Sequence, residues 1–381
     1  MDLDAARAKM PITHHRTFLD HAAVGPLSGP CRDAIGEAAT DLCEKGSVNL
    51  RSWWETMGRG RQLFADMIGA GHDEIGYVKS TSHGLLIAAN GLPLGDGDSI
   101  LTFRGEFPAN VYPWLALERK GVTTRLCEPA GRRITVDLVR EAIDETTKVV
   151  ALSHVQFGSG FRADLGAIGE LCRDRGIYFV VDMIQGAGAM PLDVRETPFD
   201  MGAADGHKWM LGPEGVGFLY CRKELLDVLE PTHVGWLSVR GAMDFTEYDL
   251  ALRPDAQRFE EGAPQTIPAC GLSASVEMLC EWGVDWISSR LLELTEVVIE
   301  EARHRGFEIL SPVDRPEERS GIVVIRLGGA DHQAIADALG ERGISVSARG
   351  GGLRISPHAY NTEDEILHAF EALDELMMGD R

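Results

Sequence analysis

The sequence lacks any apolar run that approaches the ~20 residues a membrane-spanning helix needs. Its first residues, MDLDAARAKMPI, include acidic side chains and no apolar stretch, so we expect neither a signal peptide nor membrane binding. Basic residues are also few, because 37 Lys and Arg stand against 59 Asp and Glu, a formal net charge of −22. A surface of this sign repels phosphate groups, so we expect no nucleic-acid partner.

Paired cysteines are missing as well. The seven cysteines are odd in number, scattered and without a C-x-x-C spacing, which predicts reduced thiols and a cytoplasmic protein. We expect no metal site, since the adjacent His14 and His15 would face different directions on a helix. No G-x-G-x-x-G follows the first predicted strand with an acid about 20 residues later, which argues against a nicotinamide-dependent dehydrogenase.

The sequence does contain enough apolar material for a large core, with 44% of 381 residues. Short apolar runs alternate with amphipathic helical stretches such as 84–90 and 164–175. The apolar runs lie at residues 75–78, 99–103, 149–153, 178–181 and 215–220. Strands that alternate with helices and are apolar on both faces predict an α/β fold, in which helices sandwich a mostly parallel sheet.

The pattern changes after about residue 265. Residues 268–305 have the character of long helices. They are followed by predicted strands at 321–327, 344–346 and 353–356 and by predicted helices at 331–342 and 362–378. This part predicts a smaller α+β domain. We expect a large domain at 16–265 and a small domain formed by 1–15 together with 266–381.

One segment with chemical character is the end of the strand at 178–181. The strand leads into Asp182 and then into a turn of small residues up to Gly188. Ligands of open α/β sheets bind at the carboxyl ends of strands. An unpaired carboxylate in such a dry position needs a cationic partner. Judged from these residues alone, Asp182 could equally cap the next helix.

A second such segment lies 26 residues further on, where Gly206, His207, Lys208 and Trp209 precede a glycine-rich turn at 212–217. A lysine in these surroundings is unusual for a solvated surface residue. Burial would lower its pKa and make the neutral amine available as a nucleophile toward a carbonyl group. The alternative is an exposed loop lysine.

With further motifs, these segments resemble the class V, fold-type I enzymes that depend on pyridoxal 5'-phosphate (PLP). This group includes class V aminotransferases, cysteine desulfurases and isopenicillin N epimerase-like proteins. The matching motifs are F-L-D-H-A-A at 18–23, V-D-x-x-Q-x-x-G at 181–188, G-H-K at 206–208, G-P-x-G-V-G at 212–217, F-E-E-G-A-P-Q-T at 259–266 and L-R-I-S-P-H-A-Y-N-T at 353–362. The resemblance covers nearly the whole chain and implies a seven-stranded sheet in a large PLP-binding domain.

The resemblance also implies roles for single residues. Lys208 would form the aldimine with PLP and move protons, with Asp182 against the ring nitrogen and His207 beside the phosphate. The implied PLP-binding residues are Thr81, Ser82, Phe107, Gln156, Asp182, Gln185, Asp205, His207, Lys208 and Thr266. Within this set, Phe107 would stack on the ring and Gln185 would bind its phenolic oxygen. A carboxylate repels a phosphate, so we expect Asp205 to meet an Arg or His, or to touch the substrate.

Two further implications concern the substrate and the partner. Arg354, together with Arg349, would bind the carboxylate of a small amino-acid substrate, for which a guanidinium fork is suited. Thr266 would reach the phosphate in the partner subunit, which implies a homodimer.

The reaction is the least determined part. We expect an aminotransferase that works through the Lys208 aldimine and quinonoid chemistry, because no residue supplies a dedicated elimination or hydrolysis group. A C–S or other β-elimination lyase and an epimerase are alternatives. Residues 347–353 contain no cysteine, so we do not expect a desulfurase with a catalytic cysteine. An alternative from another class is a catalytically inactive PLP-fold binding protein, against which the presence of Lys208 and Asp182 argues.

Overall fold

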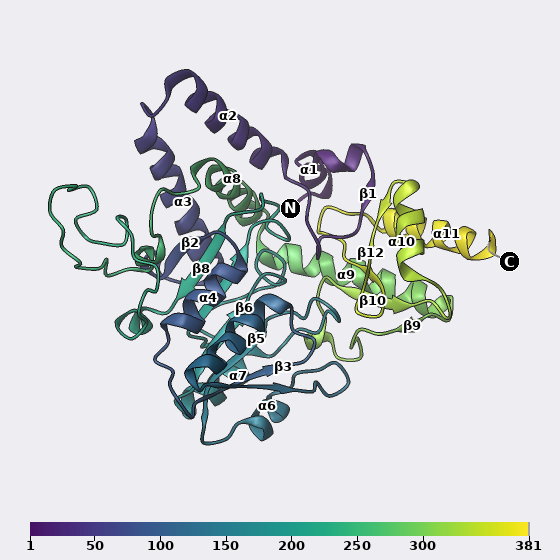
Figure 1. Ribbon diagram of the computed structural model, residues 1–381. Helices are drawn as coiled ribbons and strands as arrows, with labels where there is room; N and C mark the ends of the chain where they lie inside the picture. Colours follow the sequence, from purple (N-terminus) through teal and green to yellow (C-terminus); the bar gives the residue numbers. More distant parts are fainter. Residues whose placement is uncertain (380–381) are drawn as a thin grey trace.

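The strands of the central sheet bury apolar side chains on both faces. In β6 (Tyr178–Asp182), Phe179 and Val181 enter the core on one face, and Val180 enters the core on the other. A strand of this kind is stable only where both faces of the sheet are covered. The computed structural model, which describes residues 1–379, accordingly has helices on both sides of the sheet (Figure 1).

The central sheet has seven strands in the order β2-β8-β7-β6-β5-β3-β4. Besides β6, these are β2 (Ile75–Val78), β3 (Ser99–Phe103), β4 (Thr123–Cys127), β5 (Thr147–Ser153), β7 (Met201–Asp205) and β8 (Gly217–Cys221). Only β8 is antiparallel to its neighbours, so β2 runs in the same direction as β7. The carboxyl ends of β2, β3, β5, β6 and β7 therefore meet at one edge. The predicted fold class is confirmed.

Helices pack against the two faces of this sheet (Figure 1). They are α2 (Gly29–Lys45), α3 (Leu50–Ile68), α4 (Thr81–Gly91), α5 (Tyr112–Leu115), α6 (Val136–Ala142), α7 (Leu165–Asp174) and α8 (Thr266–Trp282). α4 contributes Leu85 and Ala88 to one core, whereas α3 and α8 contribute Phe64 and Leu279 to the core on the opposite face. α7 begins at its cap Asp164, whose side chain accepts a hydrogen bond from a backbone N–H of the first turn.

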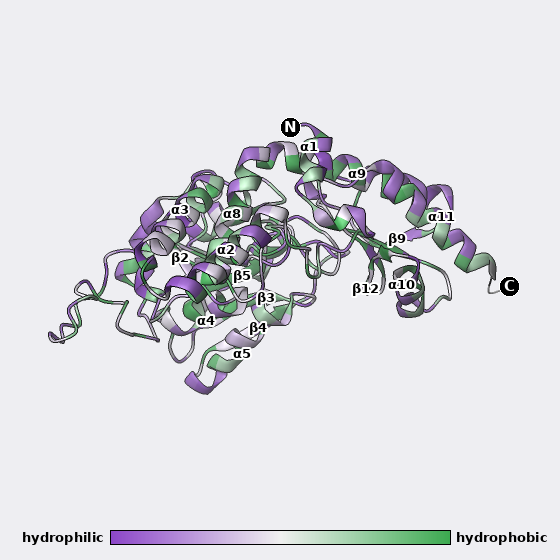
Figure 2. Ribbon diagram, turned by 90° about the horizontal axis from the view of Figure 1, so that it is seen from above, coloured by the Kyte–Doolittle hydropathy of each residue, from purple (hydrophilic) through white to green (hydrophobic). Residues whose placement is uncertain are grey.

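A second, smaller lobe lies beside the first (Figure 2). It contains an antiparallel sheet in the order β12-β13-β10-β9 and a short parallel pair, β1 with β11. Its elements are β1 (Thr17–Phe18), β9 (Glu308–Ile309), β10 (Val323–Arg326), β11 (Ile344–Ser345), β12 (Ser347–Arg349), β13 (Gly352–Ile355), α1 (Leu3–Ala8), α9 (Val284–His304), α10 (His332–Glu341) and α11 (Glu363–Gly379). Val298, Ile325 and Phe370 belong to its separate core. The domain boundaries near residues 15 and 265 stay a prediction.

Two strands of the central sheet are absent from the sequence prediction. β4 lies at the edge of the sheet and carries Thr, Arg and Cys side chains that are exposed or half-buried. β7 reads Met-Gly-Ala-Ala-Asp, which lacks the branched residues typical of strands. Its small residues are required because α4 lies directly on it: a Cβ added at Gly84 would come within 2.4 Å of the Ala203 Cβ.

An irregular arm, residues 231–255, extends away from the large lobe in both views (Figures 1 and 2). It exposes a series of large apolar side chains, namely Val234, Trp236, Met243, Phe245, Tyr248 and Leu250. Tyr248 is 97% exposed. A set of this size on one segment is characteristic of an interaction site.

Within residues 1–379, no helix combines the length and the apolar composition that crossing a bilayer requires.

Candidate active site

Lys208 lies in the turn between β7 and β8, at the edge where the carboxyl ends of the parallel strands meet. The residue is only 8% exposed, and its Nζ lies 5.6 Å from the centre of the Phe107 ring. Burial lowers the pKa of the amine to about 8, although the carboxylates of Asp182 and Asp205 act in the opposite direction. About a tenth of the amine is therefore neutral and nucleophilic at pH 7, far more than for a lysine of ordinary pKa.

Asp182 is the last residue of β6 and is 2% exposed. Its Oδ1 accepts a hydrogen bond from the backbone N–H of Ile184 at 2.9 Å. Burial raises the pKa of the carboxyl to about 7, and the nearby Glu106 carboxylate adds to this, while the Ile184 N–H and Lys208 lower it. A cation held next to this carboxyl would favour its ionised form.

The start of α4 provides a site for an anion at the same edge. Ser80 caps the helix, its Oγ accepting a hydrogen bond from the His83 N–H at 3.2 Å. The Thr81 Oγ accepts one from the Asp205 N–H at 3.0 Å, and Ser82 is exposed. The free N–H groups of such a helix terminus bind phosphate well.

Asp205 ends β7 and is paired with His207, whose Nδ1 lies 3.0 Å from the Asp205 Oδ1. This is one of the two environments that the sequence predicts for Asp205. The pair lies next to the Thr81 hydroxyl, because that hydroxyl binds the Asp205 backbone. His207 is thereby held close to the start of α4, where the resemblance places the phosphate.

Glu106 is a buried carboxylate that the sequence motifs do not single out. It follows β3 and receives hydrogen bonds from the Ser153 N–H at 2.9 Å, from the Ser153 hydroxyl and from the Gln156 amide, the last two at 2.5 Å. The amide of Asn110 is a fourth donor, at 3.3 Å. Burial raises the pKa of Glu106, and the four donors oppose this. Gln156, predicted to contact the coenzyme ring, is thus held by Glu106. The sequence could have indicated Glu106, because it follows the predicted strand at 99–103 and so lies near a strand's carboxyl end.

Gln185 is buried in the turn after β6. Its Oε1 accepts a hydrogen bond from the Trp209 indole N–H at 2.8 Å. Its Nε2 donates to the Ala22 carbonyl at 3.0 Å. Trp209 directly follows Lys208, so the predicted ring contact Gln185 is tied to the lysine turn.

Arg354, in β13, is the predicted ligand of the substrate carboxylate. Its guanidinium is almost fully buried and pairs with Asp20, the Nη2 to Oδ1 distance being 3.1 Å. It also donates to the Phe157 carbonyl at 3.1 Å. Asp20 additionally accepts a hydrogen bond from the Ser347 hydroxyl at 2.8 Å. Arg349 is exposed and donates to a neighbouring backbone carbonyl. The structure therefore brings Arg354 to the site with a counterion that the sequence does not indicate.

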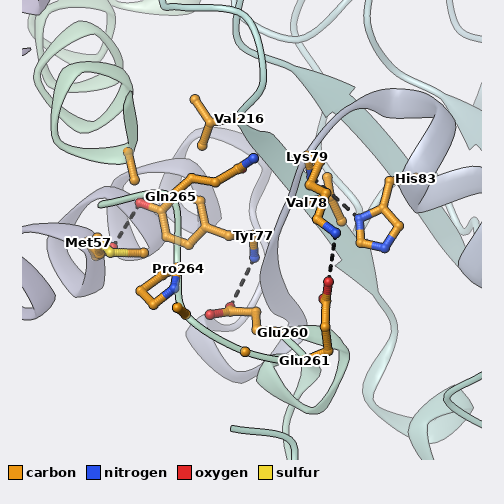
Figure 3. A pocket seen from close by; sticks show the side chains of 13 residues that line it. Met57, Tyr77, Val78, Lys79, His83, Val216, Glu260, Glu261, Pro264 and Gln265 are labelled. Carbon is orange, nitrogen blue, oxygen red and sulfur yellow. Dashed lines mark hydrogen bonds and ion pairs between the residues drawn. The ribbon is translucent and has the colours of Figure 1, made fainter. Parts of the chain in front are cut away.

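Thr266 is the first residue of α8. Its hydroxyl donates only to the Pro264 carbonyl, at 3.4 Å, among the hydrogen bonds of residues 1–379. Glu261 and Gln265, from the segment before it, line a pocket of about 190 Å³ together with Lys79 and His83 (Figure 3). The Lys79 amine and the Glu261 carboxylate, both in the lining of this pocket, form an ion pair at 2.7 Å (Figure 3).

Comparison with known proteins gives a consistent picture. The sequence model of the family described as "Aminotransferase class-V" matches residues 43–368. A protein of Methanothermobacter thermautotrophicus named "Probable cysteine desulfurase" is 28% identical, over 99% of this chain and 98% of the relative. The "Uncharacterized aminotransferase YcbU" of Bacillus subtilis is also 28% identical, over 96% of each chain.

Solved structures agree. The apo structure of a cysteine desulfurase from Thermococcus onnurineus superposes with a TM-score of 0.90 at 26% identity, over 99% of this chain and 98% of that one. A structure of C-DES, described as having glycine covalently linked to its PLP cofactor, shares the fold with a TM-score of 0.89 at 24% identity, over 96% and 98% of the two chains.

These findings correct the expected reaction. The sequence analysis put an aminotransferase first and did not expect a desulfurase with a catalytic cysteine. This expectation is wrong, because relatives that match the chain over nearly its whole length are named cysteine desulfurases. The expectation depended on the missing cysteine in residues 347–353.

Proposed function

This chain belongs to the class-V aminotransferase family of PLP-dependent enzymes, and from that membership we propose that it is a lyase that cleaves the carbon–sulfur bond of a cysteine-like amino acid. The observation that carries the proposal is a buried, partly neutral lysine beside a buried carboxyl, in a chain similar over its full length to proteins named cysteine desulfurases. The cofactor is PLP.

The residues of the site fit this cofactor. Burial leaves the Asp182 carboxyl in need of a cation, which the protonated ring nitrogen of PLP would provide. The amine of Lys208 is available for the aldehyde of PLP. The start of α4, with Thr81, Ser82 and the nearby His207, would hold the phosphate.

Each residue then has a defined task. PLP, when bound, supplies an electron sink for the carbon next to the substrate's amino group. Asp182 would hold its charge next to the ring nitrogen, and the Lys208 amine would accept and return protons. Arg354 would bind the substrate carboxylate with the N–H groups that Asp20 and the Phe157 carbonyl leave free.

The test is to incubate the PLP-loaded protein with L-cysteine and dithiothreitol and to measure sulfide together with three-carbon products. Cysteine and water give pyruvate, ammonia and hydrogen sulfide by elimination, whereas transfer of sulfur to a thiol gives alanine. We expect sulfide in amounts equal to one of these products, and none from Lys208→Ala. Failure to release sulfide from cysteine or cystine by the loaded protein would refute the proposal.

We further propose that the enzyme works as a homodimer. The arm of residues 231–255 joins the segment that ends at Thr266: a Cβ at Gly235 would overlap the Glu261 carbonyl, and the Trp236 indole lies close to Gly262. Apolar side chains exposed on this arm favour burial against a second copy. Such an interface would carry Thr266 toward the partner's phosphate site.

All seven cysteines are free, which supports a reducing compartment such as the cytoplasm.

A further inference from the structure

The amide of Gln185 is held at both ends by groups of opposite hydrogen-bonding character. The Trp209 indole N–H, which can only donate, contacts Oε1 at 2.8 Å. The Ala22 carbonyl, which can only accept, contacts Nε2 at 3.0 Å. A flipped amide would bring N–H against N–H and oxygen against oxygen. These two partners therefore permit one orientation of the amide.

Trp209 is itself fixed in position. Its ring is fully buried, and a Cβ at Gly321 would come within 2.7 Å of it. Its carbonyl lies 3.1 Å from the Nε2 of the buried His358. The indole N–H is thus a rigid donor, and Gln185 has to adapt to it.

This orientation leaves one N–H of the Gln185 Nε2 unused by the protein contacts described. We propose that Trp209 is a positioning residue, whose indole N–H holds the Gln185 amide so that this remaining N–H faces the phenolic oxygen of PLP. The proposal rests on the proposed function in one respect, namely that PLP occupies the site between Lys208 and Asp182. It does not depend on which bond of the substrate is cleaved.

The physical consequence is a change in the acid–base properties of the bound cofactor. A donor at the phenolic oxygen stabilises negative charge there and so weakens that oxygen's hold on the proton of the neighbouring nitrogen. Without the indole N–H, Gln185 can rotate and the donor is lost for part of the time. The pH midpoint of the cofactor's visible absorption should then move upward.

The experiment compares Trp209→Phe with two other single variants and one double variant of the PLP-loaded protein. Trp209→Phe keeps an aromatic ring and removes the N–H. Trp282→Phe makes the same change at a buried tryptophan whose N–H has no hydrogen-bond partner within the described residues. Gln185→Leu removes the amide altogether. Each variant, and the Trp209→Phe/Gln185→Leu double variant, is titrated by absorption against pH and by PLP for its Kd.

We expect Trp209→Phe to raise the pH midpoint by about half a unit to one unit, the effect of one hydrogen bond to a charged oxygen. The Kd for PLP should rise about threefold to tenfold. Gln185→Leu should give a similar shift, the double variant no further shift, and Trp282→Phe none.

Three results would overturn the proposal: an unchanged midpoint in Trp209→Phe, additive shifts in the double variant, or an unchanged midpoint in Gln185→Leu. None of these concerns sulfide release, so failure of this inference and failure of the proposed function can be told apart. A protein that binds no PLP at all would refute both.

Discussion

The amine of Lys208 has to lose its proton before it can attack the aldehyde of PLP, and its pKa of about 8 sets where that happens. We expect the rate at which the cofactor-free protein takes up PLP to rise about tenfold between pH 7 and pH 9 and to level off above that. Stopped-flow absorption measures this rate. A lysine of ordinary pKa would show a rate still rising tenfold per pH unit at pH 9, which would contradict the burial argument. Lys208→Ala gives the background from surface lysines.

Asp182 should make the cofactor-free protein less stable as the pH rises. Its carboxyl has a pKa near 3.8 when unfolded and about 7 when folded, so the folded state binds the extra proton in between. The stability due to this proton is complete below pH 3.8 and is lost as the pH rises through 7. Between pH 5 and pH 8 the wild type should therefore lose on the order of 2 kcal/mol of its free energy of unfolding. Asp182→Asn cannot titrate at this position and should not show this loss.

Urea denaturation of the cofactor-free wild type and of Asp182→Asn at both pH values measures the difference. Identical pH dependence in the two proteins would show that Asp182 is not desolvated as described. With PLP bound, the wild type should be the more stable of the two proteins at pH 8. The variant lacks the charge opposite the ring nitrogen, so it binds the cofactor less tightly and gains less stability from it.

Single residues of the site could be predicted where position along a strand is enough. Asp182 ends an apolar run, and strand ends converge at one edge of a parallel sheet. Lys208 was singled out by its glycine, histidine and tryptophan neighbours instead, because the strand before it, β7, was not predicted. The partners of such residues could not be predicted, because Gln156 lies 50 residues from Glu106, and Arg354 lies 334 residues from Asp20. Only the folded chain brings these pairs together. The same holds for Trp209, whose indole reaches back across the turn to Gln185.

At the scale of elements, the contact of α4 with β7 determines how the phosphate site is held. We expect Gly84→Ala to lower the free energy of unfolding by about 1–3 kcal/mol. The new methyl group would come within 2.4 Å of the Ala203 Cβ, which the strand backbone holds in place. α4 would have to move, and the Kd for PLP should rise with the loss of stability. Urea denaturation and PLP titration measure the two effects.

Two variants control for this prediction. Gly340→Ala makes the same change in α10 at a position where nothing lies within 4 Å, and it should leave the protein unchanged or more stable by about 0.5–1 kcal/mol. Ala203→Gly in the Gly84→Ala background removes the opposing methyl group and should restore PLP binding. If Gly84→Ala bound PLP as the wild type does, α4 would not be seated on β7 as described.

Sequence patterns predicted most of the central strands and long helices, but they did not predict β7. The strands at β2, β3, β5 and β6 and the long helices α8 and α9 were predicted near their observed bounds, because apolar periodicity determines them. β7 was missed because its Gly and Ala residues make room for α4, a requirement set by a distant segment. The small residues of β7 are therefore explained by its packing against α4, and not by the preference of single residues for strand conformation.

For the whole molecule, the net charge of −22 opposes association of two copies, and burial of apolar surface is the interaction that can offset this repulsion. The arm of residues 231–255 is the segment that offers such a surface, and it leads to Thr266. We expect sedimentation equilibrium to give a dimer, and Phe245→Asp with Tyr248→Asp to weaken it at least about tenfold, because two charges would have to be desolvated at the interface.

Met378→Asp is the control, since it also replaces an exposed apolar residue by aspartate, in α11, a helix that lies on the other side of the molecule from the arm (Figure 1). It should leave the dimer intact. If Thr266 of one copy serves the phosphate site of the other, the arm variant should also lose PLP affinity as it dissociates, and Thr266→Ala should lose affinity while it stays dimeric. A wild-type monomer that binds PLP as tightly at nanomolar as at micromolar protein concentration would contradict the shared site, because a site completed by a partner must empty on dilution.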